Sequence, residues 1–164
     1  EKEILYLSYH DYLTGLYNRR YYEQELARLD KKENLPLTLL LGDVNGLKFV
    51  NDTLGHLMGD ELLIKTASII SQVCRKDDIV ARLGGDEFIV ILPRTAGSVI
   101  EMMIDKIKSL AAAEKVGGLA VSISFGYETK NNEAEDIEEI FKRAEDDMYR
   151  HKQYESTAIR PRPK

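Results

Sequence analysis

The strongest structural signal in the chain is Ile79-Val80-Ala81-Arg82-Leu83-Gly84-Gly85-Asp86-Glu87-Phe88-Ile89-Val90-Ile91-Leu92. Two runs rich in apolar and β-branched residues, 79–83 and 88–92, flank four residues that are typical of a turn. The paired glycines accept the positive φ angles that a tight turn requires, so the segment predicts a β-hairpin. Its turn carries two carboxylates, Asp86 and Glu87.

Outward from this hairpin, helical and strand patterns alternate along the chain. The sequence predicts a helical lead-in over 1–9, a turn over 11–16, helices over about 18–31, 45–53, 59–74, 97–114 and 135–153, and strands over 37–42 and 119–126. This alternation, without a repeat or a linker, predicts one α/β domain. Because the hairpin pairs neighbouring strands, we expect a mixed central sheet flanked by helices rather than a wholly parallel one.

Length and composition narrow the class of protein. The chain has 164 residues, enough for one well-packed domain. Hydrophobic residues make up 43% and charged residues 31%, which is typical of a soluble globular protein. A net charge of −5 argues against a general binder of nucleic-acid polymers, which needs a basic face. No apolar run approaches the roughly 20 residues that cross a bilayer.

The two ends and the single cysteine add three expectations. The chain begins at Glu1 without Met or a signal segment, so we expect a cytoplasmic domain cut from a longer protein, which could be anchored in a membrane. Residues 158–164 are expected to form a flexible tail. The lone Cys74 excludes an internal disulfide, and its apolar helical surroundings predict a buried core thiol.

Three carboxylates are expected at one edge of the sheet. Asp43 stands where the apolar strand 37–42 ends, and Asp86 and Glu87 stand in the hairpin turn. Oxygen ligands of this kind suit Mg²⁺, which prefers a few carboxylates together with substrate phosphates. Two such ions activate a hydroxyl and stabilise a leaving pyrophosphate. The alternative is that Asp43 caps a helix and that the hairpin turn is simply solvated.

The segment between Asp43 and Asp60 has polar groups that suit guanine. Asn51 and Asp60 flank Gly55 and Gly59, which allow a ligand to approach the backbone. A carboxylate accepts hydrogen bonds from guanine N1–H and from its N2 amine. Adenine would present an acceptor instead, and an unpaired buried polar group costs about 1–3 kcal/mol. The alternative is that Asp60 is an acid near a helix N-terminus.

Two further polar residues lie in the same segment. Lys48, one helical turn after Asn45, could reach a phosphate, although a solvated lysine is the more common state. His56, between Gly55 and Leu57, fits a structural position in a turn better than a catalytic one.

Four motifs in a fixed order resemble the bacterial GGDEF family of diguanylate cyclases. They are Asp11-Tyr12-Leu13-Thr14-Gly15-Leu16-Tyr17-Asn18-Arg19-Arg20, Asp43 through Asp60, Gly84 through Phe88, and Ser122-Ile123-Ser124-Phe125-Gly126. The resemblance extends from about Leu5 to Lys152, and the ordered set is far more specific than the hairpin motif alone. It implies a GGDEF catalytic domain over 10–157. The implied fold is palm-like, with a ferredoxin-like core, and is related to adenylyl cyclase and polymerase catalytic domains.

The resemblance also implies an activity, the condensation of two GTP molecules into cyclic di-GMP with release of two pyrophosphates. It implies Mg²⁺ as the cofactor, with Mn²⁺ as an alternative. Carried across residue by residue, Asp43 and Glu87 would hold the metal, with the Val44 carbonyl as a further ligand. Asp86 would share the metal site and assist deprotonation of the attacking 3′-hydroxyl.

Nucleotide contacts follow from the same resemblance. The residues concerned are Asn51 and Asp60 for guanine, His56 near the nucleotide, Lys48 and Lys152 for the phosphates, and Arg82 in support of them. The positive side chains would offset charge that develops on the phosphates in the transition state.

Arg75-Lys76-Asp77-Asp78 matches the RxxD inhibitory site of the family, where bound product feeds back on synthesis. Arg75 can fork onto guanine O6 and N7, while Asp78 accepts from the N1 and N2 donors. Lys106 is a weakly placed candidate for a further basic residue of that pocket. Without the resemblance, the segment is typical of a solvated helix end.

Two positions depart from the family pattern. Asn45 stands where the family usually has a second Asp, which is generally not a direct metal ligand, so the change is expected to tune local charge. Ser156 stands where a phosphate-binding arginine is common, and Arg160 or Arg162 could substitute for it. The second departure bears on the level of activity and not on the family.

The symmetry of the implied product indicates how the chain would work. Because the product is two-fold symmetric and each domain has one guanine site, we expect turnover to need a homodimer with two chains face to face. The lead-in over 1–9 would then transmit dimer geometry from an upstream sensor domain in the same chain.

Three alternatives stay open from the sequence. They are a non-catalytic sensor of cyclic di-GMP at Arg75 and Asp78, an enzyme that accepts ATP to make a mixed dinucleotide, and a dimerisation module without a ligand. The complete set of metal and guanine residues favours the cyclase over the sensor. Asp60 argues against ATP because it matches the donors of guanine.

Overall fold

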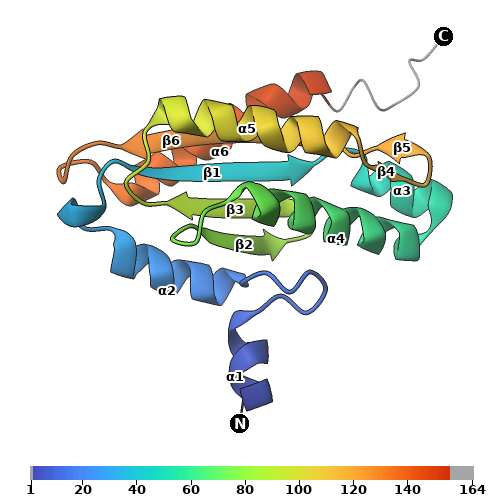
Figure 1. Ribbon diagram of the computed structural model, residues 1–164, viewed down its shortest axis with the longest axis horizontal. Coiled ribbons are helices and arrows are strands. Elements are labelled where there is room, and N and C mark those ends of the chain that lie inside the picture. The colour runs from blue at the N-terminus through green and yellow to red at the C-terminus, as the bar shows by residue number, and fades with distance from the viewer. Residues whose placement is uncertain (1, 156–164) are drawn as a thin grey trace.

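The computed structural model describes residues 2–155, and its centre is a four-stranded sheet in the order β2-β3-β1-β6 (Figure 1). Its strands are β1 (Leu37–Val44), β2 (Ile79–Gly84), β3 (Glu87–Leu92) and β6 (Ile123–Lys130). A separate two-stranded hairpin consists of β4 (Lys115–Val116) and β5 (Leu119–Ala120). The hairpin predicted over 79–92 is confirmed as β2 and β3.

Helices cover both faces of the sheet. They are α1 (Lys2–Tyr9), α2 (Arg19–Leu29), the 3₁₀ helix η1 (Lys32–Asn34), α3 (Leu47–Leu54), α4 (His56–Val73), α5 (Gly97–Ala112) and α6 (Ile137–Glu155). Each predicted α-helix is found, with small shifts at its ends. Asn18 sets the start of α2, because its side chain accepts a hydrogen bond from the Tyr21 N–H.

The fold class, an α/β domain with helices flanking a central sheet, is confirmed, but the direction of pairing differs from the expectation. Within residues 2–155, each pair of neighbouring strands in the sheet is antiparallel, whereas the sequence predicts a mixed sheet. Strands β1 and β2 do run in the same direction, as their helical crossover requires. Strand β3 lies between them and separates the parallel pair. This strand order is that of the expected ferredoxin-like core.

The strand predicted over 119–126 is wrong in its bounds. Gly117 and Gly118 have φ angles of 58° and 83°, and they turn β4 back into β5. Strand β6 therefore begins only at Ile123 and continues to Lys130. This register places Ser124 directly opposite Asp43 of β1.

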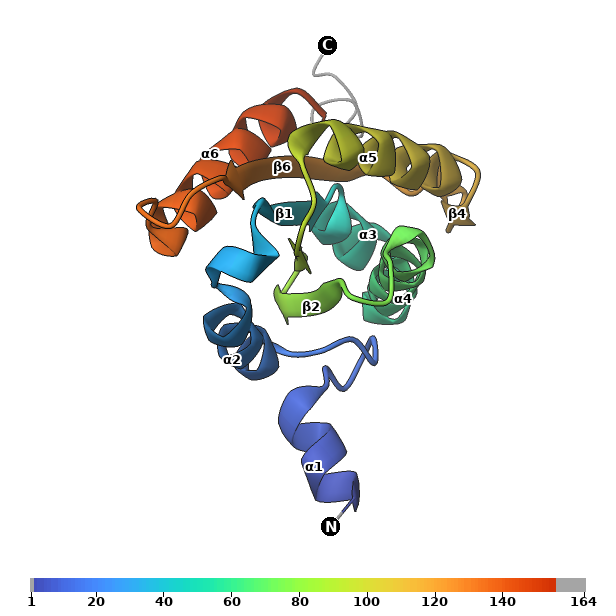
Figure 2. The same ribbon diagram turned by 60° about the vertical axis from the view of Figure 1, so that its left-hand side comes forward.

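Alternate residues of β1 supply two separate cores, because successive side chains of a strand point to opposite faces. Leu40 and Val44 pack with residues of α4 and α5, whereas Leu39 and Leu41 pack with residues of α2 and α6. Figure 2 shows β6 between α5 and α6, which lie on these opposite faces.

Helix α6 approaches the sheet closely at Gly126. A Cβ atom at this position would lie 2.1 Å from Met148 N and 2.5 Å from Ala144 O, so any larger residue would push the helix away. The missing side chain therefore sets the depth at which α6 sits on β6.

Helix α1 projects away from the sheet (Figures 1 and 2). Its exposed apolar residues include Ile4, Leu5 and Leu7. Stacked rings join it to the rest of the domain: Tyr6 lies 3.9 Å from His10, which faces Tyr17 at 4.8 Å. The helical lead-in is thus confirmed as a helix whose apolar side chains lie outside the two cores.

Three remaining expectations concern Cys74, membrane spans and the C-terminus. Cys74 is only partly buried, because it follows the last turn of α4 and packs at the rim of the core. Burial still raises the pKa of its thiol, to about 12. No helix within residues 2–155 is long and apolar enough to cross a bilayer. Ser156, Arg160, Arg162 and the predicted tail over 158–164 lie outside the described residues.

Candidate active site

The end of β1 and the hairpin turn meet at one edge of the sheet. Asp43 and Glu87 are direct partners in the pairing of β1 with β3. One residue further on, the Val44 N–H donates to the Asp86 carbonyl at 3.0 Å. The backbone therefore brings Asp43, Asp86 and Glu87 together on rigid supports, as the sequence predicts.

Asp43 is an aspartate with an unsatisfied carboxylate. The residue is 3% exposed, and its Oδ1 has no hydrogen-bond partner within residues 2–155. The only cation near this oxygen among those residues is Lys152 of α6, whose Nζ lies 2.7 Å from it but outside hydrogen-bonding geometry. The same Nζ is 3.6 Å from Asp86 Oδ2. Lys152 thus stands between the two aspartates.

The pKa values of Asp43 and Glu87 show that their ionised forms are destabilised in this site. Burial and the neighbouring Asp86 carboxylate raise the pKa of Asp43 to about 7, although Lys152 opposes the shift. Burial also raises the pKa of Glu87, helped by the charges of Asp86 and Glu145. Three carboxylates in this space repel one another, so a cation stabilises their ionised forms.

The donor set fits a magnesium ion that is completed by substrate. Among the described residues, no three Asp, Glu, His or Cys side chains converge to enclose an ion by themselves. Mg²⁺ is usually held by one or two carboxylates and by phosphate oxygens, so a full protein cage is not required. The unsatisfied Oδ1 of Asp43 is the oxygen that such an ion would use. Helix α3 has Gly46 as its N-cap, so the alternative role of Asp43 as a helix cap is wrong.

The corner between α3 and α4 carries the predicted guanine residues. Asn51 lies over Gly59, where a Cβ would come within 1.8 Å of Asn51 Oδ1. Gly55, with φ of 91°, turns the chain between the two helices. Asp60 lies next to this contact and beyond the first turn of α4, which contains no acidic residue. This position does not match an acid at the helix N-terminus.

Lys48 and His56 are exposed residues of the two helices that form this corner. Lys48 lies in the first turn of α3, and His56 is the first residue of α4. Their roles toward a nucleotide stay predictions.

Comparison with known proteins identifies the architecture. Residues 8–157 match the family model described as "Diguanylate cyclase, GGDEF domain". The chain belongs to the GGDEF family. Over 159 residues, 93% of its length, it is 35% identical to diguanylate cyclase DgcM of Escherichia coli K12, of which it covers 38%. It is 36% identical over 157 residues, 90% of its length, to the response regulator PleD of Caulobacter vibrioides, of which it covers 35%. The domain thus spans less than half of either relative.

Solved structures agree with this assignment. The coiled coil and GGDEF domain of DgcB from Caulobacter crescentus, in complex with cyclic di-GMP, matches with a TM-score of 0.85 at 26% identity, covering 93% of this chain and 84% of that one. The diguanylate cyclase SiaD of Pseudomonas aeruginosa, in complex with its activator SiaC, matches with a TM-score of 0.82 at 28% identity, covering 93% and 61%.

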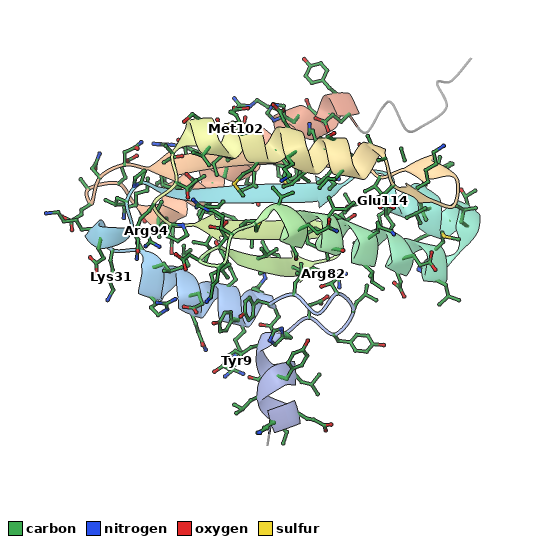
Figure 3. All side chains as sticks on the ribbon, in the orientation of Figure 1. Tyr9, Lys31, Arg82, Arg94, Met102 and Glu114 are labelled. Carbon is green, nitrogen blue, oxygen red and sulfur yellow. The ribbon has the colours of Figure 1, made fainter. Side chains whose placement is uncertain are left out.

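Arg82 of the GGDEF domain, labelled in Figure 3, makes its polar contacts within the fold. Its guanidinium forms an ion pair with Asp11 at 3.1 Å and donates to the Gly85 carbonyl from Nε at 3.1 Å and from Nη2 at 2.8 Å. The side chain is only 15% exposed. Arg82 therefore holds the hairpin turn in place, and its role toward phosphates stays a prediction.

Asp11 is a structural partner to which the sequence assigns no role. Its Oδ2 accepts from the Thr14 N–H at 2.9 Å and from the Thr14 hydroxyl at 2.7 Å. The signal was present, because an Asp three residues before a Thr is typical of a side-chain-capped turn. Its link to Arg82, 71 residues away, has no such local signature.

The predicted inhibitory pair is arranged differently from the expectation. Arg75 and Asp78 are together, but as an internal ion pair at 3.2 Å, and the Asp78 side chain is 0% exposed. Asp78 also accepts from the Arg75 N–H at 2.8 Å. It is therefore not available to guanine donors in this arrangement. Arg75 is half exposed and lines a cavity of about 390 Å³.

Lys76 and Arg94 are the other basic residues that line this cavity, and the sequence did not indicate Arg94. Arg94, which Figure 3 labels, follows Pro93 and has φ of 52°. It pairs with Asp77 at 3.1 Å. Lys106, the candidate from the sequence, is not among the residues that line the cavity. The signal for Arg94 was its place directly after the strand that Pro93 ends.

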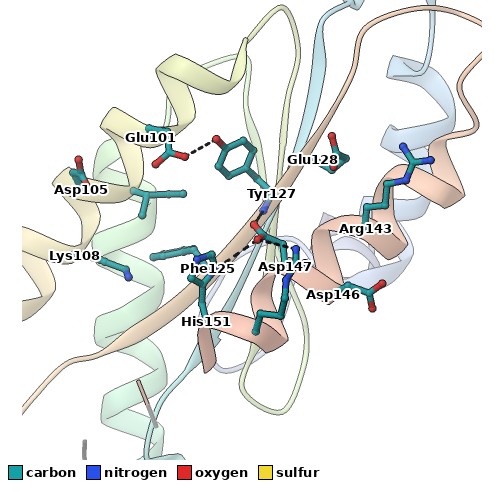
Figure 4. A pocket seen from close by; sticks show the side chains of 12 residues that line it. Glu101, Asp105, Lys108, Phe125, Tyr127, Glu128, Arg143, Asp146, Asp147 and His151 are labelled. Atoms are coloured by element: carbon teal, nitrogen blue, oxygen red, sulfur yellow. Dashed lines mark hydrogen bonds and ion pairs between the residues drawn. The ribbon is translucent and has the colours of Figure 1, made fainter. Parts of the chain in front are cut away.

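A further cavity of the GGDEF domain is lined by other residues than Asp43, Asp86 and Glu87. It measures about 810 Å³ and runs along β6 between α5 and α6 (Figure 4). Asp147 of α6 accepts from the Tyr127 N–H at 3.1 Å and thereby satisfies one backbone donor of this edge strand. None of the predicted site residues lines it.

Proposed function

We propose that this GGDEF domain condenses two GTP molecules into cyclic di-GMP and releases two pyrophosphates. The observation that supports it most strongly is the buried Asp43 beside the partly exposed Asp86, with Lys152 within ion-pair distance of both. The Asp43 Oδ1 meets the Lys152 ammonium at 2.7 Å but has no hydrogen-bond partner within residues 2–155. A site that is completed by a metal and by phosphates would leave such a carboxylate without hydrogen bonds.

The chemistry is two phosphoryl transfers. The 3′-oxygen of one GTP attacks the α-phosphorus of the other, the bond between that phosphorus and the bridging oxygen breaks, and pyrophosphate leaves. Asp86 accepts the proton of the 3′-hydroxyl, and the step repeats in the opposite sense to close the ring. A divalent cation, Mg²⁺ or Mn²⁺, held by Asp43, Asp86, Glu87 and the Val44 carbonyl, would supply charge neutralisation and acidify the hydroxyl.

Lys152 and Lys48 deal with the phosphates. Lys152 already sits within ion-pair distance of two aspartates, so its ammonium is placed where the triphosphate would meet the carboxylates. Lys48 is exposed in the first turn of α3, directly after β1. Both charges would offset the negative charge that builds on the transferring phosphoryl group.

Guanine is selected at the corner between α3 and α4. Asp60 accepts from the N1 and N2 donors and Asn51 adds a polar contact, while His56 lies at the solvent side of the nucleotide. An adenine would leave the Asp60 carboxylate facing an acceptor, which disfavours ATP.

Turnover requires a homodimer, because each chain has one guanine corner and the product is two-fold symmetric. Helix α1, with exposed Ile4, Leu5 and Leu7, would join this domain to an upstream sensor and align the two copies. An enforced dimer should therefore be active while a dilute monomer only binds GTP. Equal specific activity of the two would refute the dimer requirement. The pool of GTP places the working domain in the cytoplasm.

A second candidate, binding of cyclic di-GMP without synthesis, draws on the cavity at Arg75. Arg75, whose Nε and Nη2 bond within the domain, lines this cavity together with the positive side chains of Lys76 and Arg94. A guanine bound there would have to take the place of some of these internal contacts of Arg75. In the cyclase this cavity would be the product-inhibition site. On its own it would make the domain a sensor.

The deciding experiment is incubation of an enforced dimer with GTP and Mg²⁺, followed by chromatographic analysis of the products. We expect cyclic di-GMP and pyrophosphate from the wild type and none after chelation of the metal. Asp86→Ala and Glu87→Ala should abolish the product, and ATP alone should give none. A folded wild-type dimer that binds cyclic di-GMP but makes none would reject the cyclase in favour of the sensor. A dimer that binds neither nucleotide would support the dimerisation module.

A further inference from the structure

The last described turns of α6 carry two partly buried side chains that make polar contacts with the rest of the domain. The buried residues of this helix within the described part are Ile140, Ala144 and Met148. Over 149–155, each side chain is exposed except those of Lys152 and Glu155, which are partly buried. These two lie three residues apart and therefore share one face of the helix. Lys152 forms an ion pair with Asp43, and Glu155 makes a separate set of contacts.

Glu155 ends a chain of hydrogen bonds. Asn45 Nδ2 donates to Ser124 Oγ at 2.9 Å and to Ser122 Oγ at 3.0 Å. The Ser124 hydroxyl lies 3.1 Å from both Glu155 Oε2 and Asn45 Oδ1, and Lys108 Nζ donates to Glu155 Oε1 at 2.9 Å. Ser124 has one proton for these two acceptors, and the charged carboxylate of Glu155 is the stronger of them, so the proton goes to Glu155.

The chain is buried where it meets the sheet. Ser124 is 0% exposed and Asn45 is 3% exposed, so an unmade hydrogen bond here is costly. Ser124 is also the cross-strand partner of Asp43. Lys152 and Glu155 therefore contact two residues that are paired across β1 and β6. Lys152 forms an ion pair with Asp43, and Glu155 accepts from the Ser124 hydroxyl.

We propose that Glu155 is a positioning residue, which fixes the end of α6 through Ser124 and Asn45 and so holds the Lys152 ammonium at Asp43 and Asp86. Its role for GTP rests on the proposed function. Asn45 is part of the device, because its neutral amide oxygen is a weaker acceptor for the Ser124 proton than the Glu155 carboxylate. A carboxylate there would accept the proton and turn two negative groups toward one hydroxyl.

The anchor itself is tested without nucleotide, by amide hydrogen exchange of 149–155 in the metal-free protein. Glu155→Ala should speed exchange of these amides about tenfold, whereas Gln153→Ala, an exposed change in the same turn, should not. Unchanged exchange in Glu155→Ala would overturn the anchor. The result holds whether or not the protein is a cyclase.

The direction of the chain is tested by reversing it. Asn45→Asp alone should loosen the same amides, and Asn45→Asp combined with Glu155→Gln should restore much of the protection, since Ser124 then donates to position 45 and accepts from position 155. A double variant as loose as the sum of the two single changes would overturn the assigned direction.

The consequence for substrate is tested by a double-mutant cycle on GTP affinity and turnover. Glu155→Ala should raise KM for GTP about tenfold and lower kcat less. Added to Lys152→Ala, it should cost nothing more, because its effect passes through that lysine. Additive losses in the cycle would mean that Glu155 acts on the site by another route. Absence of any GTP turnover in the wild type would reject the proposed function, and the exchange data would still decide the anchor.

Discussion

Two aspartates near the hairpin turn, Asp11 and Asp43, differ in how many hydrogen bonds their carboxylates receive. Asp11 receives hydrogen bonds from Thr14 and an ion pair from Arg82, which in turn holds the Gly85 carbonyl. Asp43 is more deeply buried, yet its Oδ1 accepts no hydrogen bond within residues 2–155. The Asp11 carboxylate is held by hydrogen bonds that build the turn, whereas the Asp43 Oδ1 meets only the Lys152 ammonium within residues 2–155.

The pKa values follow the same division. Burial alone would raise the pKa of Asp11, but the hydrogen bonds from Thr14 and the charge of Arg82 outweigh it and lower the pKa. At Asp43 burial and Asp86 prevail over Lys152, and the pKa rises to about 7. A structural carboxylate such as Asp11 receives its hydrogen bonds from the protein. A carboxylate at a reaction site, as proposed for Asp43, receives its partners from a bound cation and the substrate.

The largest effect on activity is expected from a change at Asp43. Asp43→Asn keeps the shape but removes the charge that a divalent cation needs, so cyclic di-GMP synthesis should fall by a factor on the order of 10³ or more. Because the variant no longer buries an unsatisfied charge, its unfolding free energy in metal-free buffer should be equal to or above that of the wild type. Product assays and urea unfolding check the two parts. A clear loss of stability would mean that Asp43 is structural.

The same change at Asp11 is expected to lower stability more, and activity less, than the change at Asp43. Asp11→Asn weakens the ion pair with Arg82 and the acceptor of two Thr14 bonds, so the unfolding free energy should fall by about 2 kcal/mol. Synthesis should fall less than in Asp43→Asn, because no group that touches the substrate is lost. Urea unfolding and product assays on the same preparation decide this. Unchanged stability would remove the contrast between the two sites.

A smaller effect is expected at the other end of that ion pair. Arg82→Lys keeps the charge, but an ammonium cannot hold Asp11 and the Gly85 carbonyl in the same fork geometry, so stability should fall by about 1 kcal/mol. Thermal unfolding measures it, with Arg28→Lys on the exposed side of α2 as the control. If Arg82 instead contacted phosphates directly, GTP affinity would fall more than stability.

The smallest effect is a pH dependence of the Asp11 contribution. Its folded pKa lies below the unfolded value near 3.8, so its stabilisation is complete above that value and is lost as the pH falls through the folded pKa. The difference in unfolding free energy between wild type and Asp11→Asn should therefore be constant near neutral pH and shrink below about pH 4. A difference that grows toward acid pH would reverse the sign of the shift.

The hairpin and the carboxylates at its turn could be predicted because their signals are local. Paired glycines between two β-rich runs predict a tight turn, and an apolar run that ends in Asp43 predicts a strand with an acid at its end. The α3–α4 corner with Asn51 and Asp60 was predicted from polar residues beside glycines. The family motifs then supplied roles that spacing alone leaves open.

The contacts that the sequence did not indicate join distant segments. Arg82 was assigned to phosphates through the resemblance, which stays a prediction, whereas its partner Asp11, 71 residues earlier, was not foreseen. Asp78 was expected to face a ligand, but it is covered by Arg75. The β6 bounds were wrong because Gly117 and Gly118 form a separate hairpin. In each case a short polar segment had several possible partners.

The sequence by itself therefore determined which elements form and which residue types stand at their ends, since turn chemistry and hydrophobic periodicity act over a few residues. Only the tertiary structure decided that β3 lies between β1 and β2, that Lys152 faces Asp43, and that Glu155 reaches Ser124. Strand order and helix depth depend on packing across the whole sheet, including the contact at Gly126. Whether a buried carboxylate such as Asp11 or Asp43 finds hydrogen-bond donors depends on that packing and not on the local sequence.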